Sequence, residues 1–129
     1  MSKTVIATDK APAAIGPYSQ GVRAGNLVFT AGQAGVDPVS QQVVAGGITE
    51  QTARTFENLK AILEAGGSSL AQVVKATVFL KNMNDFAAMN TVYSAHFGQV
   101  SAPLPARTTV EAARLPKDVL VEIEMIAEA

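Results

Sequence analysis

Hydrophobic and polar positions alternate along several short segments of the chain, as they do in strands that bury one face. Such segments, rich in β-branched and aromatic residues, occur at residues 4–8, 27–31 and 73–80. The dipeptide Gly25-Asn26 precedes the second segment and predicts a tight turn from a partner strand that begins near Gly21. We therefore expect a hairpin in the first third of the chain and a long strand at residues 73–80.

Between these strands the apolar residues recur at intervals of three and four, which is typical of helices. The first predicted helix covers residues 49–65, with Thr49 as its N-cap and Gly66-Gly67 as its stop. Its apolar stripe consists of Phe56, Leu59, Ile62 and Leu63. A second helix is predicted after residues 82–85 and ends at Gly98. The stripe of this second helix consists of Phe86, Met89, Asn90, Tyr93 and Phe97.

The last quarter of the chain predicts two strands joined by a loop, at residues 105–111 and 119–126. Alternation places Arg107 and Thr109 on one face of the first strand, and Glu122 and Glu124 together on one face of the second. An arginine and a carboxylate on neighbouring strands form either a site for a small carboxylate ligand or a surface ion pair. The pattern alone leaves both interpretations open.

The order of strands, helix, strand, helix and strands predicts an α+β fold over residues 1–129, as one domain with both helices on one face of a single mixed or antiparallel sheet. The other face of that sheet mixes Leu120 and Ile126 with Glu122 and Glu124. Exposing such a face would leave a large apolar patch in water. We therefore expect a closed homo-oligomer with sites at the boundaries between subunits.

Composition removes several classes of function. Only 16% of the 129 residues are charged and the net charge is −1, whereas a nucleic-acid-binding protein normally has a basic face. Without cysteine the chain has no disulfide or thiolate ligand, and its one histidine, His96, does not make a zinc site by itself. The chain begins without an apolar signal core, and no apolar run approaches the length of a membrane span, so we expect a soluble cytoplasmic protein.

A few polar residues remain open to two interpretations. Tyr18, in a proline-flanked loop, either lines a pocket or covers the edge of the core, and Asn90 makes either a local structural bond or a pocket contact. The glycines around Gly32 lack the lysine of a phosphate loop and are expected in turns or close approaches. Lys117-Asp118 predicts a solvated turn before the last strand.

Six ordered segments, which span nearly the whole chain, carry a resemblance to a known family. They are residues 14–21, 29–33, 84–86, 105–110, 113–119 and 122–124. In order and spacing they closely resemble the motifs of the reactive intermediate deaminase (RidA/YjgF) family, in its archetypal 2-iminobutanoate/2-iminopropanoate deaminase branch. The resemblance implies a fold like that of bacterial chorismate mutase, assembled as a homotrimer with clefts between subunits. It also implies hydrolysis of 2-imino acids to 2-oxo acids and ammonia, without metal or cofactor.

The resemblance also implies roles for single residues. The family's substrate-carboxylate arginine falls on Arg107, whose planar guanidinium suits a carboxylate, and its acidic residue falls on Glu122, which would orient or activate the attacking water. Tyr18, Gly32 and Asn90 match positions that line the family's cleft. Glu124 shares the face of Glu122, but we expect a structural role for it.

Two residues depart from the family pattern. Thr109 stands where this branch usually has cysteine, and because the backbone carbonyl thought to hold the water is retained there, we expect activity to survive. Ala31 replaces a serine of many relatives, so one hydroxyl contact to the substrate is missing. Alternative functions are an RNA-directed endoribonuclease that inhibits translation, which the low charge disfavours, and a non-catalytic ligand-binding or chaperone-like trimer.

Overall fold

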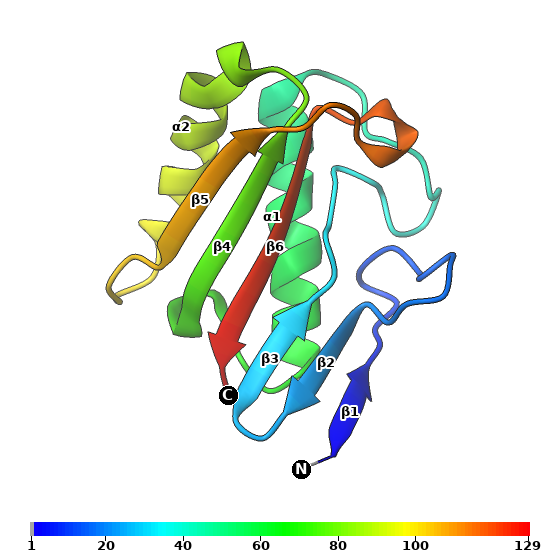
Figure 1. Cartoon of the computed structure of the whole chain (residues 1–129), viewed down its shortest axis with the longest axis vertical. Helices are drawn as coiled ribbons and strands as arrows, with labels where there is room; N and C mark the ends of the chain where they lie inside the picture. Colours follow the sequence, from blue (N-terminus) through cyan, green and yellow to red (C-terminus); the bar gives the residue numbers. More distant parts are fainter. Residues whose placement is uncertain (1) are drawn as a thin grey trace.

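A computed structural model describes residues 2–129, which form one mixed sheet of six strands and two α-helices (Figure 1). The strand order across the sheet is β1-β2-β3-β6-β4-β5. The strands are β1 (Lys3–Ile6), β2 (Gly21–Ala24), β3 (Leu27–Thr30), β4 (Val73–Leu80), β5 (Ala106–Glu111) and β6 (Val121–Glu128). The helices are α1 (Ile48–Ala65) and α2 (Phe86–Phe97), and short 3₁₀ turns occupy Leu70–Gln72, Met83–Asp85 and Pro116–Asp118.

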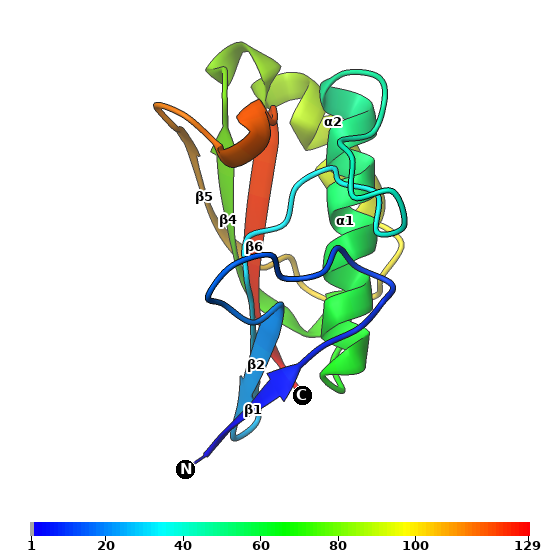
Figure 2. The same cartoon turned by 90° about the vertical axis from the view of Figure 1, so that its right-hand side faces the viewer.

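Both helices lie on the same face of the sheet, as the edge-on view in Figure 2 shows. This arrangement confirms the predicted α+β fold. The predicted hairpin is also confirmed, because β2 and β3 pair antiparallel around the two-residue turn Gly25-Asn26. Gly25 has a φ of 62°, which explains a glycine at that position. The α1 stripe predicted from three- and four-residue spacing is fully buried, with Phe56, Leu59, Ile62 and Leu63 all 0% exposed.

The first helix begins one residue earlier than predicted. Its N-cap is Gly47, so the expected Thr49 cap is wrong. A glycine has no side chain to cap with, but the Glu50 carboxylate accepts the Gly47 backbone N–H at 2.7 Å. The acidic residue three positions into the helix therefore satisfies the free donor that a cap would otherwise address.

The strands of the last quarter are not neighbours, which corrects the sequence-based expectation. β4 lies between them and pairs parallel with β5 on one edge and antiparallel with β6 on the other. A parallel pair needs a long crossover connection, and α2 provides it between β4 and β5. Alternation within β5 and within β6 was correctly predicted. Alternation does not show, however, that β4 lies between these two strands.

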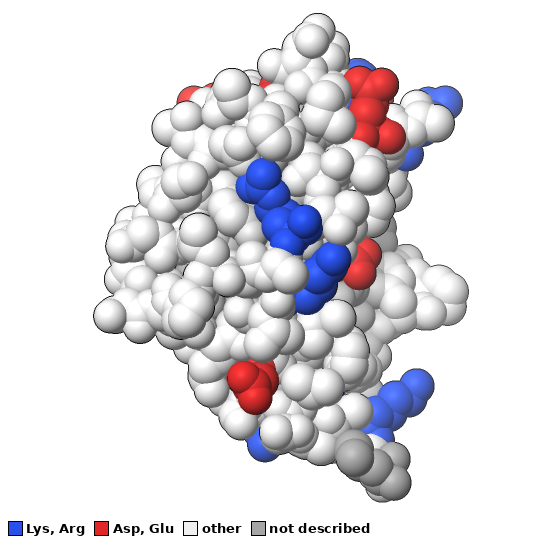
Figure 3. Space-filling model, turned by 60° about the vertical axis from the view of Figure 1, so that its left-hand side comes forward, with Lys and Arg blue, Asp and Glu red and all other residues white. Residues whose placement is uncertain are grey.

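The face of the sheet opposite the helices is open and mixed in character. It carries Phe79 and Val110 in register with Glu122, and Phe29 in register with Ile126. Val110 is 41% exposed. Seen from the side shown in Figure 3, the surface is largely uncharged, with a short row of basic side chains near its middle. Exposed apolar side chains gathered on a face of this kind are unfavourable in water and typical of a surface that meets another molecule.

Candidate active site

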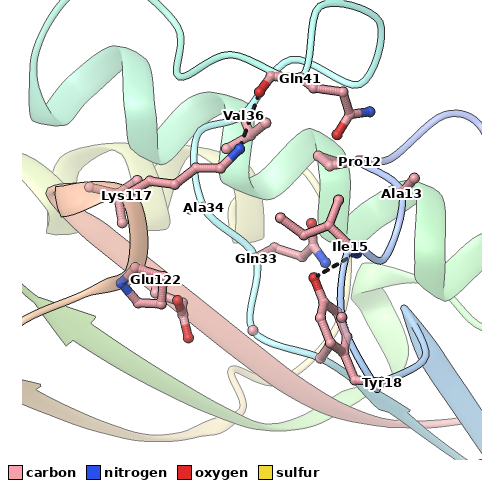
Figure 4. Close-up of a pocket in the computed structure, with 15 residues that line it drawn as sticks. Pro12, Ala13, Ile15, Tyr18, Gln33, Ala34, Val36, Gln41, Lys117 and Glu122 are labelled. Atoms are coloured by element: carbon pink, nitrogen blue, oxygen red, sulfur yellow. Dashed lines mark hydrogen bonds between the residues drawn. The ribbon is translucent and has the colours of Figure 1, made fainter.

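A pocket of about 500 Å³ opens where the N-terminal loop, the segment after β3 and the start of β6 meet (Figure 4). It contains three of the residues predicted for the site, because Tyr18, Gly32 and Glu122 all line it. Its remaining walls are mostly apolar. The other lining residues are Pro12, Ala13, Ile15, Gly16, Ala31, Gln33, Ala34, Val36, Gln41, Pro116, Lys117 and Val119.

Glu122 and Gly32 are packed directly against each other. Gln33 and Ile123 exchange two backbone hydrogen bonds of 2.9 Å, which hold the segment after β3 beside β6. A Cβ added at Gly32 would overlap the Glu122 carboxylate, so a side chain at this position would push the carboxylate out of its present place. The glycine was therefore correctly predicted to serve a close approach.

The Glu122 carboxyl lies half-buried at the edge of the pocket. Burial raises its pKa above the ordinary glutamate value, and the negative charge of Glu124, two residues along β6, raises the pKa further. A carboxylate that holds its proton more tightly than an exposed one is a better acceptor for a proton taken from water. The position of Glu124 thus gives it an electrostatic effect on the site without a place in the pocket wall.

Tyr18 lies at the open side of the pocket and is 51% exposed. Its phenol oxygen faces the Ile15 backbone N–H at 3.5 Å, a long contact (Figure 4). The loop that carries it is anchored by the buried side chain of Gln20, whose Nε2 donates to the carbonyls of Thr8, Ala11 and Pro12 at 2.7–3.2 Å. The same amide accepts the Thr8 N–H at 2.7 Å. One glutamine therefore holds the irregular segment in place.

The other predicted residues gather on α2 and β5. The Arg107 Nη1 donates to Asn90 Oδ1 at 2.6 Å, and its guanidinium carbon lies 4.6 Å from the centre of the Tyr93 ring. Thr109 lies on the same face of β5, and its hydroxyl is buried without a hydrogen-bond partner among residues 2–129. The open question about Asn90 is resolved in one respect, because its side chain bonds to Arg107.

Register places these two groups on opposite faces of the sheet. Arg107 is aligned with Ala76 on β4, and Ala76 is aligned with Met125 on β6, a buried residue on the helix side. Glu122 is aligned with Phe79, on the open side. The predicted site residues therefore form two clusters in one chain, Tyr18-Gly32-Glu122 and Arg107-Asn90-Thr109, which do not meet.

Sequence reasoning missed the far wall of the pocket. Lys117 was predicted only as part of a solvated turn, yet its Nζ donates to the Gln41 carbonyl at 3.2 Å across the pocket rim (Figure 4). Both residues have left-handed backbones, with φ of 59° and 61°. Neither is a glycine, so the sequence carries no signal for these conformations. His96 stacks on Phe56 with ring centres 4.6 Å apart, which gives it a packing role.

Two further properties concern what the chain could bind. Among the described residues, no group of three His, Asp or Glu side chains is arranged to hold a metal ion. No helix formed by those residues is long and apolar enough to cross a membrane.

The chain is a small α+β protein with two clusters of polar residues. One cluster lines a mostly apolar pocket on the open face of the sheet, and the other surrounds Arg107 on the helix side. Comparison with known proteins identifies the family: residues 8–129 match the family model described as Endoribonuclease L-PSP. The chain belongs to this family, which includes the RidA/YjgF proteins.

Close relatives cover almost the whole chain. A RutC family protein of Pyrococcus abyssi is 58% identical, and a 2-iminobutanoate/2-iminopropanoate deaminase of Salmonella typhimurium is 54% identical, each over 98% of both proteins. Among solved structures, E. coli TdcF with bound serine superimposes with a TM-score of 0.93 at 46% identity, over 98% of each chain. The chain is therefore similar over its full fold to proteins that carry a deaminase name.

The bonds of Gln20 give a prediction about the pocket loop. Gln20→Ala removes a buried amide whose two N–H groups are shared among three carbonyls and whose oxygen accepts one N–H, and it should lower the free energy of unfolding by about 2–4 kcal/mol. Gln99→Ala is the matched control, because Gln99 is exposed, and it should change stability by less than about 0.5 kcal/mol. Chemical denaturation at one fixed chain concentration measures both, and equal effects of the two substitutions would contradict the anchoring role.

Proposed function

We propose that this protein hydrolyses reactive 2-imino acids, such as 2-iminobutanoate and 2-iminopropanoate, to the 2-oxo acid and ammonia. The observation that carries the proposal is the presence of two groups in one chain, an arginine whose guanidinium is held in a fixed orientation and a pocket carboxyl with a raised pKa. Relatives named for this activity, at 53–54% identity over 98% of the chain, support it.

We further propose that the working site lies between copies of the chain in a homotrimer. Arg107 and Glu122 lie on opposite faces of one sheet, so a substrate held by both must contact two subunits. Arg107, Asn90 and Thr109 of one copy would face Tyr18, Gly32 and Glu122 of the next. The mixed open face, with Phe79 and Val110 beside Glu122, supports such packing because a second copy would cover it.

In this site Arg107 binds the substrate carboxylate through two parallel N–H donors, and the Gly32 backbone N–H is a further donor to it. The protonated imine carbon then lies within reach of a water held by Glu122, and positioning supplies much of the acceleration. As the new C–O bond forms, the Glu122 carboxylate takes a proton from the water. Return of that proton to the nitrogen makes it a leaving group, and the freed Glu122 carboxylate then takes the carbinol O–H proton as the C–N bond breaks and the carbonyl forms. That proton passes to the departing ammonia, which leaves as ammonium and restores the carboxylate. One water is consumed for each ammonia released.

An endoribonuclease function, which the description of the family model suggests, has less physical support. Binding to RNA rests on phosphate contacts from Lys and Arg. The net charge of the chain is −1, and the side shown in Figure 3 is largely uncharged, with one short basic row and several scattered acidic groups. The pocket around Glu122 suits a small ligand better than a phosphate backbone.

The role of Arg107 can be tested directly. Arg107→Ala should lower kcat/KM for freshly generated 2-iminobutanoate by about 30-fold or more, because a charge pair with the substrate is lost. Release of ammonia or of the 2-oxo acid is the measurement. Arg114→Ala is the matched control, since Arg114 is exposed and lies in neither cluster. The proposal fails if the wild-type protein gives no acceleration or if Arg107→Ala keeps the full rate.

The division of the site between subunits has its own test. Arg107→Ala and Glu122→Ala chains, each inactive alone, should recover about a quarter of the wild-type activity when unfolded together in equal amounts and refolded. At random assembly, about one cleft in four combines an intact arginine with an intact glutamate. The control is each variant refolded alone. Absence of recovery, with assembly shown by size, would contradict a site shared between subunits.

The raised pKa of Glu122 predicts the acid side of the pH profile. The base must be deprotonated, so kcat should fall as the pH drops through a pKa above the ordinary value of 4.5. Bound substrate neutralises Arg107, which leaves burial and Glu124 as the causes of the shift. Glu124→Gln removes the second cause and should move the acid limb to lower pH. Glu64→Gln, on the exposed side of α1, is the control, and an acid limb that stays unmoved or rises in Glu124→Gln would contradict this assignment.

A further inference from the structure

One stripe of α2 surrounds the guanidinium of Arg107. Phe86, Asn90 and Tyr93 are spaced by four and three residues and therefore share one face of the helix. Each of them contacts Arg107, at 5.5 Å from its guanidinium carbon to the Phe86 ring centre, 2.6 Å from Nη1 to Asn90 Oδ1 and 4.6 Å to the Tyr93 ring centre. We propose that this stripe is a preformed cradle, and that Tyr93 and Phe86 are positioning residues for Arg107. The inference rests on the proposed deaminase function.

The contacts act on different degrees of freedom. A guanidinium held over an aromatic ring is attracted to the ring face, which restrains the tilt of the cation. The hydrogen bond to Asn90 restrains rotation about the Arg107 side-chain axis. A guanidinium has five N–H donors in a rigid fork, so the donors that Asn90 does not take remain available for a carboxylate. Tilt and rotation are thus set before a ligand arrives.

The cradle is anchored in the hydrophobic core. Tyr93 is 6% exposed and meets Phe56 of α1 edge to face, with ring centres 5.5 Å apart and planes at 84°. It also packs on Phe97 at 4.8 Å. Because Phe56 is fully buried beneath Tyr93, the Tyr93 ring has little room to move.

A separate contact fixes β5 against the start of the same helix. The Glu111 carboxylate, at the end of β5, accepts the Met83 backbone N–H at 2.8 Å in the turn that leads into α2. The position of Arg107 relative to α2 is therefore fixed both by the stripe and by the Glu111–Met83 hydrogen bond. Phe86, at the outer end of the stripe, is 37% exposed and shields one side of the guanidinium from water, which strengthens its attraction for an anion.

This arrangement predicts how affinity depends on the ring. Tyr93→Leu removes the aromatic face and should raise KM for 2-iminobutanoate roughly 3- to 30-fold, the range expected for a desolvated cation–π contact. Tyr93→Phe keeps the ring and should retain most of the affinity, because the Tyr93 hydroxyl has no hydrogen-bond partner among the described residues. Phe86→Leu should raise KM by about twofold, since this ring lies farther away.

A control and a double-mutant cycle separate positioning from damage to the core. Val28→Ala opens a cavity in the core at β3, a strand that does not pair with β5, so it should destabilise the protein without a matching rise in KM. In an Arg107→Lys background, Tyr93→Leu should add little further loss, because an ammonium has no plane to be oriented. Equal losses in both backgrounds, or a Tyr93→Phe variant as impaired as Tyr93→Leu, would overturn the cradle.

The same variants distinguish failure of the cradle from failure of the proposed function. If no variant and no wild-type protein hydrolyses the imine, the function fails, but the coupling of Arg107 and Tyr93 in the free energy of unfolding still tests the contact. Non-additive destabilisation by Arg107→Lys and Tyr93→Leu supports the cradle. Strictly additive destabilisation overturns it, whatever the activity.

Discussion

The pleat of the sheet is the constraint on which the rest of the molecule depends. Successive residues of a strand point to opposite faces, and register across β5, β4 and β6 sends Arg107 toward the helices and Glu122 toward the open side. No side-chain rotation changes that assignment. A chemistry that requires both groups on one small molecule therefore requires two sheets, and the apolar character of the open face is consistent with this need.

The two clusters are supported by different parts of the structure. Arg107 rests on α2 and, through Tyr93, on the fully buried Phe56, so its position is set by close packing. Glu122 is on a strand, but the pocket around it is completed by loops, whose shape depends on the hydrogen bonds of Gln20 and on the absence of a side chain at Gly32. The rigid half suits recognition of a charged group, and the loop half suits adaptation to the variable part of a ligand.

Local patterns in the sequence predicted local structure well. The α1 stripe was predicted because its buried residues recur at three- and four-residue spacing. The Gly25-Asn26 turn was predicted because a φ of 62° favours glycine. The pairing of β5 with β4 was missed because it depends on a crossover of non-local segments. Family motifs singled out Arg107 and Glu122, but alternation within each strand could not relate their faces without the register. The contact of Lys117 with Gln41 was missed because the two residues are 76 positions apart in the sequence, and Lys117 was assigned only to a turn.

The buried hydroxyl of Thr109 has a practical consequence. It lies on the same face as Arg107, in a chain without a single cysteine. A thiol-reactive dye or spin label has no native target in this protein. A cysteine introduced by substitution, at Thr109 or on the exposed rim of the pocket, would be the sole thiol of the chain. A label on the exposed rim of the pocket would therefore report on that cluster alone, against an unlabelled background.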